Sequence, residues 1–362
     1  MLSTSVQSPA SVASHSSAVP ILLNKIFTAS RPKRRESFRI KLSIILFLFI
    51  SVTSYSQDNV KKNIDSTTFI SFKKIIDLPH PNKKRIWFIA GANVAGYGTS
   101  LILFSKAWYK NYPHTSFHTF DDHKEWLQCD KAGHAWAAYN SGRVSAAMWR
   151  WTGLSEKKAT LIGGFSSTIY LTVIEFLDGH SAQWGWSWSD MAANVFGSGF
   201  FIGQQLLWRQ QRIQYKFSFH HNDYGSPQLN SRADDLFGDA WYERMLKDYN
   251  AQTYWFSANI KSFFPKSNLP PWLNVAVGYG ADGMFGGFNN KWTQDYPPFV
   301  IDRTDIPRKR QFYLAPDIDF TKIKTKSKFL RTTFYFLNAF KCPAPALMLD
   351  SKGKFRGYVF YF

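Results

Sequence analysis

The sequence predicts an α+β protein, in which a hydrophobic four-helix bundle precedes an antiparallel β-rich module. Three observations support this prediction. Long apolar runs of helical length are confined to residues 86–210. Alternation of apolar and polar residues starts near residue 212 and recurs toward the C-terminus. Aromatic residues make up 18% of the chain, which suits a large aromatic core and also the aromatic belt of a membrane interface. The bundle is therefore a candidate for embedding in a membrane.

The N-terminal region has the pattern of a secretory signal that is displaced inward. Residues 1–32 are rich in Ser, Ala and Pro, and we expect them to be disordered. A basic stretch at 33–41 then precedes the apolar run 42–52 and the small residues 53–56. The apolar run is shorter than the about 20 residues that span a bilayer. We therefore expect export to the cell envelope, to the periplasm or outer membrane, with cleavage near residue 56.

These patterns divide the chain into four predicted parts. They are a leader with signal peptide at 1–56, a polar linker at 57–85, a hydrophobic helical domain at 86–210 and a β-rich domain at 211–362.

The net charge indicates which partners to expect, and the cysteines indicate whether a disulfide or a lipid anchor is expected. The formal net charge is +19, with basic residues spread along the chain. For an exported protein this favours membrane lipid or other envelope components as partners, and we expect no nucleic acid.

Cys129 and Cys342 show no spacing typical of a disulfide framework, so we expect two unpaired thiols, with one disulfide as the alternative. Neither cysteine follows the signal directly, so lipid attachment at the mature N-terminus is not indicated.

Four helices are expected within the hydrophobic domain. Residues 87–105 carry no charge over the length of a membrane span. Residues 131–151 have an amphipathic helical pattern, and 160–176 and 191–208 are apolar. The last run contains Gly199-x-x-x-Gly203, which predicts close helix contact. Because Gly, Ser, Thr and Asn are frequent in all four, burial in a bundle is the alternative to contact with lipid.

The β-rich domain is expected to form an antiparallel sheet or a small barrel. Aromatic and β-branched residues alternate with polar ones at 213–219. Further strands are predicted at 252–264, 272–281, 310–320, 329–338 and 354–362. The terminal Phe362 resembles the assembly signal of outer-membrane barrels, and a plain aromatic strand is the alternative.

Ionisable residues lie on or beside the apolar helices, where an unpaired charge costs several kcal/mol. Asp130 and His134 are four residues apart and share a helical face, which predicts a hydrogen bond between them. Lys131 is expected to neutralise Glu175 or Asp178. Ser187-x-x-Asp190 fits a helix capping box. The candidate catalytic residues are Asp130, Lys131, His134, Glu175, Asp178, His180, Asp190 and Asn194.

These ionisable residues suit three roles: structural ion pairs, a metal site, or acid–base catalysis. The candidate ligands of a divalent metal are Asp130, His134, Glu175, Asp178 and His180. A His–carboxylate pair also suits acid–base catalysis. Because the spacing matches no specific motif such as His-Glu-x-x-His, we expect mainly structural ion pairs.

The order of these motifs carries a family resemblance. Asp130-Lys131-x-x-His134, followed by Glu175 and by S-W-S-D-x-x-x-N-x-x-G at 187–197, resembles the YfiM-like family of uncharacterised envelope proteins. The order is more weakly similar to that of VanZ-like membrane proteins. The resemblance covers residues 126–208, and the β-rich extension looks like the version found in Bacteroidetes-type envelopes. It implies an envelope location but no defined activity.

We therefore expect an exported protein with a structural, lipid-associated or cell-wall-associated role rather than an enzyme. One alternative is an enzyme that acts on a lipid-linked or cell-wall substrate through Asp130, His134 and Glu175. Another is a transport or channel component built on the C-terminal strands.

Overall fold

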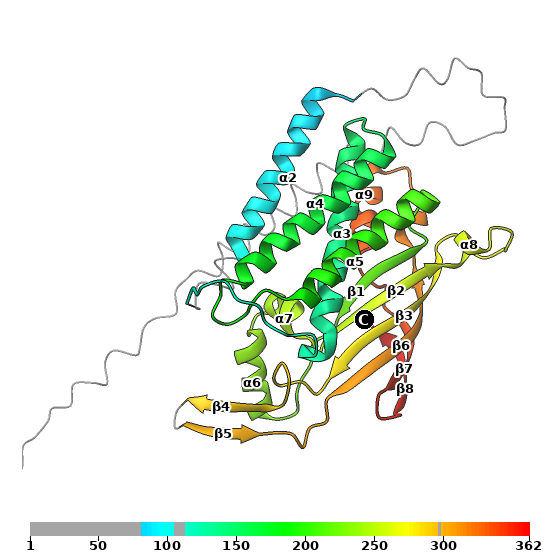
Figure 1. The fold of residues 1–362 in the computed structure, drawn as a ribbon. Helices are drawn as coiled ribbons and strands as arrows, with labels where there is room; N and C mark the ends of the chain where they lie inside the picture. The colour runs from blue at the N-terminus through cyan, green and yellow to red at the C-terminus, as the bar shows by residue number, and fades with distance from the viewer. Residues whose placement is uncertain (1–80, 105–112, 296–297) are drawn as a thin grey trace, which may run out of the picture. The chain divides into compact units, whose positions relative to one another are not determined.

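The computed structural model describes residues 81–104, 113–295 and 298–362, all of which fall in one compact unit (Figure 1). The predicted leader, the signal peptide and most of the predicted linker lie outside the described residues. Within them, long helices precede a mostly antiparallel sheet, which confirms the α+β prediction.

Three of the long helices pack closely on one another. They are α3 (Cys129–Trp151), α4 (Glu156–Asp178) and α5 (Trp188–Trp208). Glycine makes this approach possible: a Cβ atom at Gly163 would lie 2.4 Å from the backbone nitrogen of Ala146. A Cβ atom at Gly197 would lie 2.1 Å from the carbonyl oxygen of Ala135. The predicted contact through Gly199 and Gly203 is wrong for the described part of the chain, because a Cβ atom at either would meet none of its atoms within 4 Å.

The first long helix, α2 (Lys83–Phe104), meets α3 and α4 through a small number of polar and aromatic contacts. The Ser100 hydroxyl lies 2.8 Å from the Tyr170 hydroxyl, and the rings of Tyr97 and Tyr170 stack at 4.6 Å. A four-helix bundle is therefore not shown. The structure shows a three-helix bundle with α2 alongside it.

The main sheet has six antiparallel strands in the order β1–β2–β3–β6–β7–β8. Their bounds are β1 Ile213–Phe219, β2 Gln252–Asn259, β3 Leu273–Asp282, β6 Lys309–Ile318, β7 Ala344–Asp350 and β8 Phe355–Tyr361. A separate hairpin consists of β4 (Lys291–Asp295) and β5 (Pro298–Asp302). The shorter helices are η3 Glu125–Gln128, α6 Pro227–Phe237, α7 Trp241–Lys247, α8 Ile260–Phe263, η4 Phe320–Lys322 and α9 Lys328–Leu337.

One predicted strand is a helix. Residues 329–338 were expected to be extended because they are rich in aromatic and β-branched residues, but they form α9. The Ser327 side chain caps this helix by accepting the Leu330 N–H, and the apolar residues recur at helical spacing. The strand predicted at 252–264 is also too long: Asn259 ends β2 and caps α8 by accepting the Ser262 N–H.

The helices and the sheet share an aromatic core. Tyr139 of α3 and Phe201 of α5 pack with Tyr215 of β1 and Tyr254 of β2. The sheet curls away from this core, so that edge strand β8 reaches β2: the hydroxyls of Tyr361 and Thr253 lie 2.8 Å apart. The inner face of the curl holds the fully buried Lys216 and a second hydrophobic core around Trp255, Tyr313 and Tyr361.

Candidate functional site

A left-handed turn sets the start of the site. Trp126, Leu127 and Gln128 have φ angles of 47°, 49° and 65°, a conformation that costs about 1–3 kcal/mol for each residue other than glycine. Three contacts hold it: the Trp126 N–H donates to the Gly287 carbonyl at 2.8 Å, Tyr279 donates to the Leu127 carbonyl, and Arg310 donates to the Gln128 side chain. The turn ends where α3 begins, so it fixes the positions of the first side chains of that helix.

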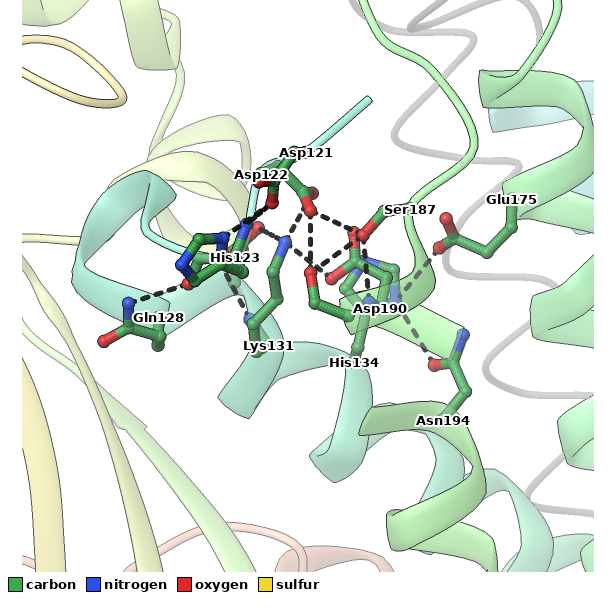
Figure 2. Close-up of polar contacts among 12 residues, drawn as sticks. Asp121, Asp122, His123, Gln128, Lys131, His134, Glu175, Ser187, Asp190 and Asn194 are labelled. Carbon is green, nitrogen blue, oxygen red and sulfur yellow. Dashed lines mark hydrogen bonds and ion pairs between the residues drawn. The ribbon is translucent and has the colours of Figure 1, made fainter. Parts of the chain in front are cut away.

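The first group of side chains is the lysine cluster, which consists of Lys131, Asp122, Asp130 and Asp190 (Figure 2). The Lys131 ammonium lies 2.8 Å from Asp130 Oδ2 and 2.9 Å from Asp190 Oδ1, and it also binds Asp122. The hydroxyls of Ser187 and Ser189 donate to Asp122 at 2.6 and 2.7 Å. The cluster therefore ties the loop before α3 to the first turns of α3 and α5.

The second group is the histidine cluster, which consists of His134, Glu175, Asp190 and Asn194. It joins all three packed helices (Figure 2). His134 Nδ1 lies 3.2 Å from Asn194 Oδ1 and 3.5 Å from Glu175 Oε1, and His134 Nε2 lies 3.8 Å from Asp190 Oδ1. Asp190 belongs to both clusters. The His134 side chain is 25% exposed, whereas that of Glu175 is 1% exposed.

Burial and charge shift the pKa values in opposite directions. Burial tends to raise the pKa of Asp122, but hydrogen bonds from Lys131, Ser187 and Ser189 lower it to about 2. Burial raises the pKa of Asp130 to about 6 against the attraction of Lys131. Burial likewise raises the pKa of Glu175 to about 8, although His134 counteracts this. Asp190 and Glu175 raise the pKa of His134 against the effect of its burial.

The structure brings most of the predicted residues together, but with different partners. Lys131 binds Asp130 and Asp190, not Glu175 or Asp178 as predicted. The expected Asp130–His134 hydrogen bond is replaced by the contacts of His134 in the histidine cluster. Ser187 does cap α5 by accepting the Asp190 N–H at 3.0 Å, while the Asp190 side chain turns to Lys131 instead of closing a capping box.

Two predicted residues lie apart from both clusters. His180 Nδ1 is 2.9 Å from the Phe176 carbonyl oxygen, and its ring packs against Phe117 and Phe176. Among the described residues, Asp178 and His180 belong to neither group of side chains that converge as metal ligands. Both cysteines are free, Cys129 buried and Cys342 partly so.

Sequence reasoning missed Asp122 and Ser189, and it gave Ser187 only a capping role. Asp122 lies in a loop with no helical or strand period, so no pattern linked it to α3. The available signal was the Asp121-Asp122-His123 run just upstream of the turn. Glu125 was missed as well: burial, with Asp130 and Asp122 nearby, raises its pKa to about 7.

Residues 119–203 match the family described as "Predicted periplasmic lipoprotein (DUF2279)". This segment contains both clusters. Searches of curated proteins and of solved structures give no significant match. The periplasmic location in the family description agrees with the predicted export, and the YfiM-like and VanZ-like resemblances stay predictions. Residues 119–203 are thus similar to a family of uncharacterised envelope proteins, and the chain is exported to the cell envelope.

Proposed function

We propose that this is a non-enzymatic envelope protein that holds an apolar outer surface against a lipid bilayer, while the two clusters keep its helices in register. The observation that carries the proposal is the exposed apolar outer face of the main sheet. In water, an antiparallel sheet buries its apolar face and exposes its polar one. Here the outer face is apolar and exposed, while the buried inner face combines polar side chains with an apolar cluster around Trp255 and Tyr313.

The exposed apolar face is clearest on β3, β6 and β7. Side chains on the outer face are each between 43% and 53% exposed: Val275, Val277, Phe312, Leu314, Leu347 and Leu349. The opposite face of the sheet is buried. Its polar side chains, from β1, β2, β3 and β6, are at most 2% exposed: Lys216, Thr253, Ser257, Asn259, Asn274 and Asp317. An apolar cluster is buried on the same face: Trp255, Ala276, Tyr313, Ala315, Ala346, Met348 and Tyr361. An apolar outer face that alternates with a partly polar inner face is similar to the pattern of strands that contact lipid. Six exposed apolar side chains on adjacent strands exceed the scattered single ones that water tolerates.

The apolar surface continues from the sheet onto the helices. Phe196 of α5 packs edge-on against Phe256 of β2 at 6.4 Å, and Phe256 is the register partner of Val277. Phe196 is itself 52% exposed. On α4, which packs against α5, a stripe of exposed residues follows the helical repeat: Ile162, Phe165, Ile169, Val173 and Phe176. Sheet and helices thus present apolar side chains on adjoining elements.

Basic residues indicate that the lipid in contact with the apolar outer surface is anionic. Lysines at every second position lead into α9: Lys322, Lys324, Lys326 and Lys328. They are followed by Phe329 and Leu330, which are 62% and 41% exposed. Apolar side chains beside a run of cations suit the boundary between acyl chains and anionic headgroups.

By length and hydropathy, α4 is the one described helix that qualifies as a candidate membrane span, and 33% of its apolar window is buried. The uncharged run at 87–105 falls largely within α2, its last residue lies outside the described residues, and its role as a span stays a prediction. The proposal therefore rests on the combined outer surface and not on one spanning helix.

Carbonate extraction of isolated envelopes tests the proposal. Alkaline carbonate strips proteins held by charge alone and leaves those held by apolar contact. We expect the protein to stay in the membrane pellet. Complete release into the supernatant would contradict contact with the acyl region.

A second candidate is an enzyme that uses the histidine cluster on a lipid-linked or cell-wall substrate. One observation favours it: the His134 ring is partly exposed and lies between the carboxyl groups of Glu175 and Asp190, an arrangement suited to a general base. Mass spectrometry of envelope lipids and cell-wall fragments would compare wild-type cells with cells that carry a folded His134→Gln protein. A compound that accumulates only in the variant would favour the enzyme, and identical profiles would favour the non-enzymatic role.

A further inference from the structure

We infer that His134, Glu175 and Asp190 form a binding site for a divalent transition-metal ion, which locks α3, α4 and α5 together. This inference does not depend on lipid contact. One ring nitrogen of His134 and one carboxylate oxygen each from Glu175 and Asp190 lie within 4.8 Å of one another. Bonds of about 2.0–2.2 Å to a shared ion would bring such atoms to about 3.3 Å apart, so small side-chain movements are sufficient.

A buried oxygen without a hydrogen bond provides the second observation. Glu175 Oε1 accepts no hydrogen bond from the described residues, although its side chain is 1% exposed and points at the His134 ring, 3.5 Å from Nδ1 (Figure 2). A buried carboxyl oxygen without a hydrogen bond is expensive to maintain. An ion shared by His134, Glu175 and Asp190 would bind this oxygen.

The orientation of the His134 ring also suits a residue that binds a metal ion. Asn194 Oδ1 lies 3.2 Å from Nδ1, so a proton on Nδ1 leaves the lone pair of Nε2 facing Asp190 Oδ1 at 3.8 Å. A lone pair and a carboxylate repel each other unless a metal ion or a second ring proton lies between them. A metal-bound histidine typically donates its other N–H to an oxygen, which is the role that Asn194 would have here.

Local charge favours a cation as well. The lysine cluster already places three aspartates around the single Lys131 ammonium. Glu175 adds a fourth buried carboxyl group close by, with His134 as the other group able to carry positive charge. This set of four carboxyl groups therefore exceeds its two cations. One imidazole with carboxylates suits Zn²⁺ or Mn²⁺, and the imidazole disfavours Ca²⁺ or Mg²⁺.

Metal binding to the purified full chain tests the inference. The protein in detergent would be stripped with a chelator and dialysed against Zn²⁺ or, separately, Mn²⁺. Elemental analysis would then give the bound ions per chain, and competition with a zinc indicator would give the Kd. We expect one ion per chain. The isosteric Glu175→Gln change should weaken binding at least about tenfold, because an amide oxygen carries no charge to the ion.

The matched control is Asp121→Asn. Asp121 pairs with His123 at 2.6 Å in an exposed His–carboxylate contact outside both clusters. This variant should bind the metal as tightly as the wild type. A urea unfolding curve for each protein would show that it is folded, and His134→Gln replaces Glu175→Gln if the latter does not fold. Absence of stoichiometric metal, equal affinity in Glu175→Gln, or equal loss in Asp121→Asn would overturn the inference and leave a protonated His134–carboxyl pair in its place.

Discussion

Lys131 of α3 and Asp190 of α5 form an ion pair of 2.9 Å in which the two side chains are only 11% and 9% exposed. The same ammonium binds Asp130 and Asp122, so one cation links two helices and the loop before α3. Such pairs add little net stability over apolar packing, but the loss of one partner leaves uncompensated charge in the interior.

Replacement of Lys131 by Met should therefore be strongly destabilising, by about 3–5 kcal/mol, because three aspartates lose their shared cation. Urea unfolding in detergent, followed by tryptophan fluorescence, measures the change. The control is Lys291→Met, which removes an exposed ion pair of 2.8 Å with Asp302 and should cost at most about 1 kcal/mol. Similar losses in the two variants would show that the lysine cluster has no special role.

Two glycines on α5 allow a matched test of the helix packing. Gly197→Ala places a Cβ atom 2.1 Å from the Ala135 carbonyl oxygen of α3 and should destabilise the protein by about 1–3 kcal/mol. Gly199→Ala meets no atom of the described residues within 4 Å and should stabilise the protein by about 0.5–1 kcal/mol through helix propensity. The same unfolding curves compare them. Equal effects from both substitutions would contradict the described contact between α3 and α5.

Glu125 predicts a pH dependence of stability. Burial, with Asp130 and Asp122 nearby, raises its pKa from 4.5 to about 7 in the folded protein. The folded state therefore holds a proton that the unfolded state releases, so this group costs stability as the pH rises from about 4.5 to 7 and no more above that. Unfolding free energies of wild type and Glu125→Gln should thus diverge over this interval, with the variant increasingly favoured. A constant difference would refute the assignment.

The helices could be predicted from sequence because their apolar runs have the length and period of helices. The same reasoning failed where composition and period disagree. Residues 329–338 have the aromatic composition of a strand, but the Ser327 cap and helical spacing make them α9. Strand β7 was not predicted. Pro345 near its start is unfavourable within a strand, and the register shift between Ala344 and Ala346 lies at this residue.

The site could be predicted only in part, for a related reason. Spacing along one helix correctly marked Asp130, Lys131 and His134 as important positions. It could not give their partners, because these come from other elements. Asp122 reaches Lys131 from a loop, and Glu175 reaches His134 from α4. Pairing across elements depends on tertiary packing, which period and motif do not encode.

The central claim, that the outer face of the sheet contacts lipid, is tested most directly by flotation of the purified full chain with vesicles of anionic and of zwitterionic lipid. We predict that the wild type floats with vesicles, more completely with anionic ones. We also predict that Leu314→Asp with Leu347→Asp, register partners on the exposed face, abolishes flotation, while Thr293→Asp on exposed β4 has no effect. Flotation of the double variant to the same extent as the wild type, with both proteins folded, would contradict the claim.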